Sequence, residues 1–197
     1  KKQKEDEDHP KNILLYEEQI YLLVTKQDGG LPQYIYFALM NLLTADNEEG
    51  EARSEVDTVV TTKRIKAVPA TLTILIESII ARLEEKHGEE MVREVLTLLY
   101  LSRNGIRQSE ACEILGVPDS RFLSFLYSLQ PLLQVSKNTD FDELINLRSI
   151  SVYNSVNRRY ALKQGESLMS QNMHQRIIQY FLPACTEQII KQEDGKL

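Results

Sequence analysis

From residue 72 to residue 131, apolar side chains recur every three or four positions, and the main interruptions are glycines and prolines. The first segment carries its apolar residues along one helical stripe, at Leu72, Leu75, Ile76, Ile79, Ile80 and Leu83. This spacing predicts an amphipathic helix that ends near Gly88, and such a helix must bury its stripe against a partner. A second helix, predicted from about Glu89 to Ser102, provides that partner.

The stretch that follows has the layout of a helix-turn-helix. We predict a short helix over residues 106–115, a turn at Gly116-Val117, and a further helix from Pro118 to Gln130. Pro131 should end that helix because proline cannot donate a hydrogen bond inside one. Beyond it we predict a strand over 132–135, a polar loop over 136–146, and strands over 148–153 and 159–162 joined by a hairpin at 154–157. Three helices and a small sheet with a hairpin wing make a winged helix.

Helices are predicted on both sides of this unit. Residues 13–26 and 32–44 are dense in apolar residues and are separated at Asp28-Gly29-Gly30; the second is apolar almost all round and should be buried. Residues 45–68 are polar or rich in threonine and valine, which predicts a long loop or linker. Residues 167–181 predict a helix and residues 183–192 a shorter one.

The predicted fold class is therefore mainly α, with a helical bundle, then a winged helix, then C-terminal helices. The predicted divisions are a polar lead-in over 1–12, a helical domain with a long acidic loop over 13–68, a winged-helix domain over 69–165, and C-terminal helices over 166–197.

Composition excludes several classes of protein. The chain has 197 residues, 42% of them hydrophobic, which is enough to bury a core. Its apolar residues never run unbroken for about 18 positions, so no membrane segment is predicted, and without a secretory leader we expect a cytoplasmic protein. The two cysteines, Cys112 and Cys185, form no C-x-x-C pair, so neither a disulfide framework nor a zinc site is indicated.

The sequence gives catalysis little support. It contains neither G-x-x-x-x-G-K-[ST] nor G-x-G-x-x-G, the loops that cradle phosphates. His9, His87 and His174 lack the spacing of metal ligands. We expect no enzymatic activity, no metal site and no cofactor held by this chain alone.

A helix-turn-helix raises the question of nucleic-acid binding. A helix that reads DNA presents Arg, Lys, Asn or Gln to the bases, but the helix over 118–130 carries one acid, Asp119, and one base, Arg121. The net charge of −6, from 23 basic and 29 acidic residues, also argues against duplex binding. We favour a winged helix that packs against protein. The alternative is a nucleic-acid binder that uses bases on the predicted wing, which are Arg148, Arg158, Arg159 and Lys163.

The segment Gly30-Leu31-Pro32, followed by the buried helix through Leu43, resembles the G-L-P segment of signal-transduction ATPases with numerous domains, the group that includes NACHT and NB-ARC proteins. Four further segments are similar to the NACHT proteins that carry WD or tetratricopeptide repeats, of which telomerase-associated protein and nephrocystin-3 are examples. These segments cover residues 98–105, 109–117, 129–133 and 174–181. The resemblance covers roughly residues 13–182.

This resemblance implies a non-catalytic regulatory fragment, with a nucleotide-binding domain upstream and a repeat domain downstream as its partners. It implies that ATP or ADP with Mg²⁺ is held by the parent protein, where Gly30, Leu31 and Pro32 contact the adenine. A plain helix-capping turn remains an equal interpretation of these three residues. Many members place a histidine after the last wing strand, where this chain has Lys163; either the lysine substitutes for it or the chain has been trimmed nearby.

Overall fold

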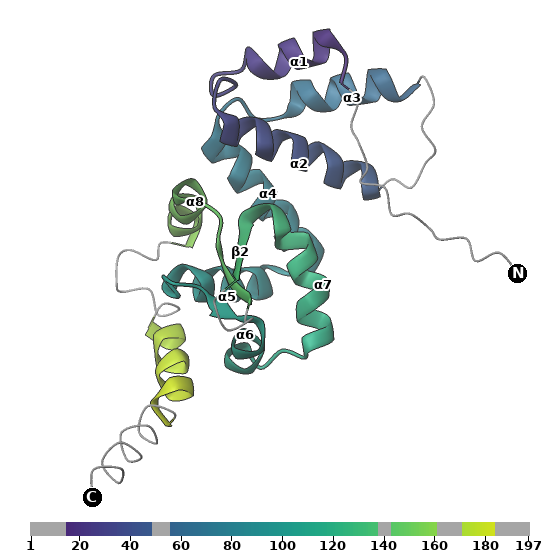
Figure 1. Ribbon diagram of the computed structural model, residues 1–197. Helices are drawn as coiled ribbons and strands as arrows, with labels where there is room; N and C mark the ends of the chain where they lie inside the picture. The colour runs from purple at the N-terminus through teal and green to yellow at the C-terminus, as the bar shows by residue number, and fades with distance from the viewer. Residues whose placement is uncertain (1–14, 49–55, 138–142, 161–170, 184–197) are drawn as a thin grey trace, which may run out of the picture. The chain divides into compact units, whose positions relative to one another are not determined.

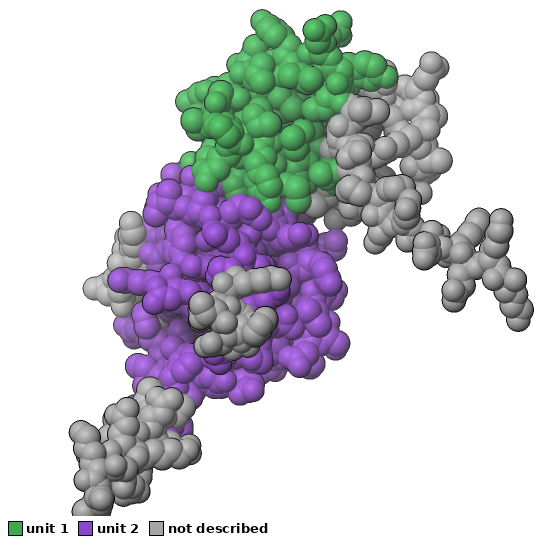
Figure 2. Space-filling model, in the orientation of Figure 1, with its two compact units in different colours: residues 1–75 green, residues 76–197 purple. Residues whose placement is uncertain are grey.

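The computed structural model describes residues 15–48, 56–137, 143–160 and 171–183 (Figure 1). These residues belong to two compact units, residues 1–75 and residues 76–197, coloured separately in Figure 2. The described chain is mainly helical and contains one small three-stranded antiparallel sheet. The predicted fold class is thereby confirmed. No helix in these ranges combines the length and the apolar character needed to cross a membrane.

Unit 1 is helical throughout its described residues. It contains α1 (Glu17–Val24), α2 (Pro32–Glu48), α3 (Val56–Ala67) and the first turn of α4 (Leu72–His87). The first three helices pack against one another, as Figure 1 shows. Among the unit's described residues, the buried apolar ones are Leu23, Tyr34, Phe37, Ala38, Leu42, Ile65, Val68, Leu72 and Leu75. Because α2 supplies the two buried aromatic rings, it is the central helix that its apolar sequence predicts.

The helix α3 corrects the prediction that residues 45–68 form a loop or linker. Threonine and valine have low helix propensity, and the prediction followed that preference. In the structure Ile65 is completely buried and the side chain of Gln19 donates a hydrogen bond to the Thr62 hydroxyl oxygen at 3.0 Å. Packing against α1 and α2 thus overrides the weak local preference.

Unit 2 contains the winged helix. After the rest of α4, its elements are α5 (Glu89–Leu101), β1 (Ile106–Arg107), α6 (Gln108–Leu115), α7 (Asp119–Leu129), the 3-10 helix η1 (Gln130–Leu132), β2 (Leu133–Lys137), β3 (Glu143–Leu147), α8 (Ile150–Tyr160) and a helix over residues 171–183. The sheet order is β1-β3-β2, with Ile106 opposite Ile145 and Leu133 opposite Leu147. The order helix, strand, helix, helix, strand, strand is that of a winged helix whose wing is the β2–β3 hairpin.

The wing lies earlier in the sequence than predicted. Residues 148–162 were expected to form the hairpin, but Ile150–Tyr160 is the helix α8. The β-branched residues there suit a strand, yet Val152 and Val156 are both completely buried while Ile150 is 72% exposed, which is helical spacing. The Ser149 side chain also accepts a hydrogen bond from the Val152 amide at 3.4 Å, as a helix N-cap does. Packing of these residues against α5 therefore favours the helix over the predicted strand.

Smaller corrections concern neighbouring segments. Residues 106 and 107 form β1 rather than the start of a helix, and the expected loop over 136–146 includes the end of β2 and most of β3. The lead-in over 1–12 and residues 184–192 of the second C-terminal helix lie outside the described residues.

Candidate interaction sites

The Gly30-Leu31-Pro32 segment lies at an exposed turn before α2. Pro32 occupies the first position of the helix, where its missing amide hydrogen has no cost. A Cβ atom added to Gly30 would meet nothing within 4 Å, and Leu31 is 47% exposed. The turn is therefore open to a partner group. Contact of these three residues with adenine stays a prediction.

The residues on either side of this turn hold the α3–α4 connection. Lys26 donates from its ammonium group to the carbonyl oxygens of Lys66 at 3.2 Å and Val68 at 2.5 Å, at the end of α3. Burial lowers the Lys26 pKa. Since the last carbonyls of a helix carry partial negative charge, an ammonium group is a suitable cap.

The start of α4 is capped from the same turn. The Asp28 carboxylate accepts a hydrogen bond from the Leu72 amide at 2.7 Å, and the Asp28 amide donates to the Ala70 carbonyl at 3.1 Å. The Tyr34 hydroxyl donates to the Pro69 carbonyl at 2.7 Å; burial, and after it the charge of Asp28, raises the Tyr34 pKa to about 12. These caps could not be predicted from the sequence, because capping between segments about 40 residues apart leaves no periodic signal.

An apolar strip faces solvent along α1. Tyr21 is 67% exposed, and Ile20 and Val24, one turn apart, are each 46% exposed. Tyr16, before the helix, is 63% exposed. Clustered exposed aromatic and aliphatic side chains of this kind are typical of protein contact surfaces.

The three predicted nucleic-acid contacts that the structure describes, Arg148, Arg158 and Arg159, do not lie on the β2–β3 hairpin. Arg159 forms a bidentate ion pair with Glu84, donating from Nε to Oε1 at 2.8 Å and from its terminal nitrogen to Oε2. The Tyr160 hydroxyl donates to Glu84 Oε1 at 2.6 Å, and Arg158 lies 3.6 Å from Glu77. Arg158 and Arg159 therefore fasten α8 to α4 within unit 2.

Of the remaining two residues, the structure describes Arg148 alone. Arg148 follows β3 and donates from Nε to the Pro131 carbonyl oxygen at 3.1 Å. Lys163 lies outside the described residues. The structure thus brings Arg158 and Arg159 together on α8 with acidic partners, and it assigns none of the described three to the hairpin.

The Glu84 pair is electrostatically stabilised. Burial raises the Glu84 pKa, but the hydrogen bonds from Arg159 and Tyr160 and the nearby positive charge outweigh it, so the pKa is lowered overall. The hydrogen bond to Glu84 raises the Arg159 pKa, and burial raises the Tyr160 pKa. All three groups keep their ordinary charge states near neutral pH.

The third helix of the helix-turn-helix, α7, presents a mixed and partly apolar face. Tyr127 is 75% exposed and Leu123, one turn earlier, is 40% exposed. The charged residues of the helix are the exposed Asp119 and Arg121 near its start. This face lacks the cluster of bases and amides that a DNA-reading helix presents.

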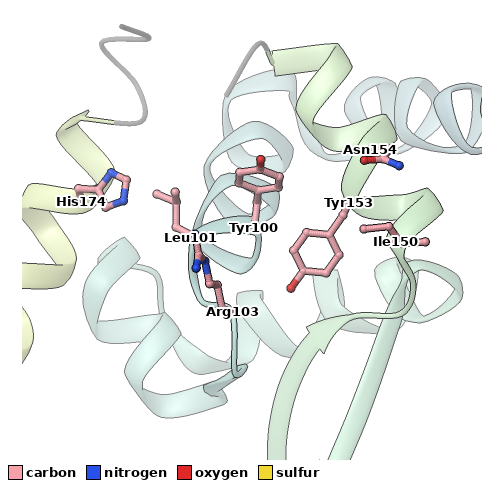
Figure 3. Close-up of a pocket in the computed structure, with 7 residues that line it drawn as sticks. All are labelled: Tyr100, Leu101, Arg103, Ile150, Tyr153, Asn154 and His174. Atoms are coloured by element: carbon pink, nitrogen blue, oxygen red, sulfur yellow. The ribbon is translucent and has the colours of Figure 1, made fainter. Parts of the chain in front are cut away.

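A cavity of about 310 Å³ lies in unit 2, where three helical segments meet (Figure 3). Its lining residues come from the end of α5 and the turn after it, from α8 and from the helix over 171–183; they are Tyr100, Leu101, Arg103, Ile150, Tyr153, Asn154 and His174. The rings of Tyr100 and Tyr153 lie 5.7 Å apart, with planes inclined by 50°. No sequence motif predicts this group of residues, which come from distant parts of the chain.

The described residues offer no metal centre, since none of them form a group of three or more His, Cys, Asp or Glu side chains. Burial, assisted by the hydrogen bond with Asp119, raises the pKa of the buried Cys112 thiol to about 12, so that thiol is unreactive. His87 packs edge-on against Phe125, with ring centres 5.0 Å apart, and burial and then Lys86 lower its pKa. His9 and Cys185 lie outside the described residues.

Comparison with known proteins finds relatives for part of the chain. Over 103 residues it is 28% identical to telomerase protein component 1 of Mus musculus and 26% identical to that of Rattus norvegicus. Each match covers 51% of this chain but 4% of the relative. No family profile and no solved structure matches the chain. The chain thus shares a distant, partial similarity with a protein component of telomerase, which agrees with the resemblance to telomerase-associated protein.

Proposed function

We propose that this chain is a non-catalytic regulatory and protein-interaction module of a NACHT-type signalling or scaffold ATPase. In this proposal it packs against a nucleotide-binding domain upstream, relays its nucleotide state to a downstream repeat domain, and works in the cytoplasm. The upstream domain holds ATP or ADP with Mg²⁺, and Gly30, Leu31 and Pro32 contact the adenine.

The exposed face of α7 carries this proposal. Tyr127 and Leu123 occupy exposed positions of α7, where a helix that binds DNA carries charged or amide side chains. The negative charge of Asp119 offsets the positive charge of Arg121 on the same helix. Exposed aromatic and aliphatic groups bind by burial against a second protein surface, and tyrosine is enriched at such interfaces. The apolar strip on α1 supports the same role. The partial similarity to a protein component of telomerase supports membership in an assembly.

One experiment tests the interaction role at α7. The chain is titrated against the neighbouring domains of its parent protein, and affinity is measured by calorimetry. We expect Tyr127→Ser combined with Leu123→Ser to weaken binding about tenfold or more, because both variants remove contact area at the surface. Ser120→Ala on the same helix is the matched control and should bind normally. Equal binding by all forms would remove α7 from the interface.

A second experiment tests the nucleotide role. Thermal unfolding of a longer natural chain that includes the upstream domain is followed with and without ADP. A ligand that binds the folded state raises the melting temperature, so Pro32→Ala should reduce the ADP-induced rise. Pro118→Ala, which replaces a proline at the start of α7, is the control. An unchanged ADP-induced rise in Pro32→Ala would remove Pro32 from the nucleotide site.

The catalytic part of the proposal has its own test. Residues 1–197 alone should show no ATP hydrolysis. Turnover by the purified chain that disappears on substitution of one of its own residues would refute a non-catalytic module.

The nucleic-acid alternative gains no support from the geometry, because Arg158 and Arg159 pair with acids and Arg148 bonds to a backbone carbonyl. A gel-shift titration with duplex DNA should therefore show no specific retardation. Salt-dependent binding that falls when Arg158 and Arg159 become alanine would restore the alternative.

A further inference from the structure

The cavity between α5, α8 and the helix over 171–183 has walls held by specific contacts. On one side, Met173 is 1% exposed, and Arg176 donates to the Ile114 carbonyl at 2.9 Å and to Glu94 at 3.0 Å. These contacts fix the helix that carries His174. Figure 3 shows His174 on this wall, with Ile150, Tyr153 and Asn154 on the opposite wall of α8.

Two of the lining residues, Arg103 and Tyr153, are held in place by Asn146 in β3. Its side-chain oxygen accepts hydrogen bonds from the Tyr153 hydroxyl at 2.7 Å and the Leu147 amide at 2.8 Å. Its side-chain nitrogen donates to the Arg103 carbonyl oxygen at 3.3 Å. One amide thus orients a tyrosine from α8 and the backbone of an arginine that follows α5. A site fixed in this way loses less conformational entropy on binding.

Gly105 makes the turn after α5 that places Arg103. Its φ is +87°, a conformation that L side chains rarely adopt. A Cβ atom there would also lie 3.1 Å from the Ile145 carbonyl oxygen and 3.2 Å from the Leu144 Cβ. The close approach of this turn to β3 brings Arg103 to the edge of the cavity.

The cavity is lined by a positively charged side chain and by no negatively charged one. Arg103 is exposed, and within the described ranges its guanidinium has neither an ion pair nor a hydrogen bond. The lining contains no carboxylate. Beside this cation lie two tyrosine rings and the side chains of Leu101 and Ile150, the latter 72% exposed. Arginine binds carboxylates through a planar fork of donors, and tyrosine supplies rigid apolar contact area.

We propose that this cavity binds a peptide segment of a partner protein in which an acidic side chain lies close to apolar or aromatic ones. The carboxylate pairs with Arg103, and the apolar side chains lie against Tyr100, Tyr153 and Ile150. This inference goes beyond the interaction role proposed for α7 and α1, and it rests on that role only in taking a protein as the partner. A single-stranded nucleic acid is a poorer fit, since it needs a groove with several cations along its backbone.

The test is a titration of the isotopically labelled chain, followed residue by residue by NMR. The probe is a short peptide in which two glutamates follow phenylalanine and leucine, and the matched peptide carries glutamines in place of the glutamates. We expect the acidic peptide to shift the amide signals of residues 100–103, 150–154 and 174, with affinity that falls as salt rises. The glutamine peptide should bind about tenfold more weakly, in keeping with loss of a charge-assisted hydrogen bond.

Two variants complete the test. Arg103→Gln should weaken the acidic peptide about tenfold and leave the glutamine peptide unchanged. Arg121→Gln, which removes an exposed arginine from α7, should leave both affinities unchanged. The same spectra show whether each variant is folded.

Several outcomes overturn the proposal. Equal binding of the two peptides would do so, and so would the absence of any shift at the lining residues. Shifts produced by raising the chain concentration alone would indicate that a second copy of the chain is the occupant. Tighter binding of a single-stranded oligonucleotide would indicate a nucleic acid instead. The α7 and ADP experiments do not involve the cavity residues, so a failure here leaves the proposed function standing and the reverse also holds.

Discussion

The two units of the molecule fasten their helices by different chemistry. In unit 1 the turn before α2 caps the end of α3 and the start of α4, with Lys26 and Asp28 bonding to backbone carbonyls and an amide. In unit 2 the helix α8 and the helix over 171–183 are held by arginines paired with glutamates, at Glu84 and Glu94.

This difference has consequences for how each unit responds to change. A cap on a backbone group depends on close placement of the chain and is insensitive to the identity of the capped residue. An ion pair between side chains depends on charge, and it responds to salt and to pH. Unit 1 should therefore be most vulnerable to steric changes in its turn, and unit 2 to changes of charge. The predictions below test that contrast.

The largest effect is expected at Gly29 in unit 1. A Cβ atom there would overlap the carbonyl oxygens of Leu23 and Val24, which are backbone atoms of α1 and cannot simply rotate away. We expect Gly29→Ala to destabilise unit 1 by about 3 kcal/mol, in the upper range for overpacking. Hydrogen exchange resolved by residue should show the loss in α1 and α2. The control is Gly30→Ala, where the added atom meets nothing within 4 Å; equal losses in both variants would contradict the steric argument.

The turn and the ion pairs also show how far a sequence determines this fold. The amphipathic spacing of 72–83 and the Gly116 turn predicted α4, α6 and α7 closely, because there local preference and packing agree. The prediction failed at α3 and α8, where β-branched residues form helices because neighbouring helices bury Ile65, Val152 and Val156. The i, i+4 spacing of Val152 and Val156 is visible in the sequence, but the helices that bury these residues are not, and local β propensity favours the strand.

The candidate sites were harder to predict than the fold. Gly30-Leu31-Pro32 was found from a short motif and does lie at an exposed turn. Arg158 and Arg159 were visible as bases, but their partners Glu77 and Glu84, which lie 81 and 75 positions earlier, could be recognised only in the folded chain. The cavity at Arg103 also combines residues far apart in the sequence.

In unit 2, the largest effect of a charge change is expected at Glu84. Its side chain is 11% exposed and accepts hydrogen bonds from Arg159 and Tyr160. Glu84→Gln should destabilise the unit by about 2 kcal/mol, because it leaves a partly buried guanidinium without its charge partner. Glu85→Gln, at the exposed neighbouring position, is the matched control.

The sign of the pH dependence follows from the lowered Glu84 pKa. Its stabilisation is complete above the ordinary value of 4.5 and is lost as the pH falls below it towards the folded-state pKa. Denaturant unfolding at a series of pH values should therefore show native and Glu84→Gln chains converging in acid. A constant difference at all pH values would contradict the ion-pair assignment.

A smaller effect is expected at the cap of α4 in unit 1. Asp28→Ala removes the acceptor of the Leu72 amide and should cost about 1.5 kcal/mol, as loss of a helix cap does. Asp28→Asn retains a side-chain oxygen acceptor and should recover most of that loss. Because a neutral acceptor suffices, high salt should change the stability difference between the two variants little. A large salt effect would contradict the contrast drawn between the units.

A pH effect of smaller size is expected at His87, which ends α4. Its pKa is lowered from 6.5, so the neutral ring is favoured in the folded state. The stabilisation is complete above about pH 6.5 and falls as the pH drops towards the folded-state pKa. His87→Gln should flatten the stability curve between pH 7 and pH 5, approximately the range in which histidine titrates.

The smallest effect is expected at a buried hydroxyl group in α5 of unit 2. Thr97 in α5 is completely buried, and its hydroxyl has no hydrogen-bond partner among the described residues. Valine has nearly the same shape, so Thr97→Val removes an unsatisfied hydroxyl without opening a cavity and should stabilise the unit by about 0.5 kcal/mol. Thermal and denaturant unfolding measure the change, with Thr97→Ala as the control that does open a cavity and should destabilise. A destabilised valine variant would mean that the hydroxyl has a bonded partner, such as a buried water molecule, and that α5 is held by a neutral polar contact as well as by the arginine pairs around it.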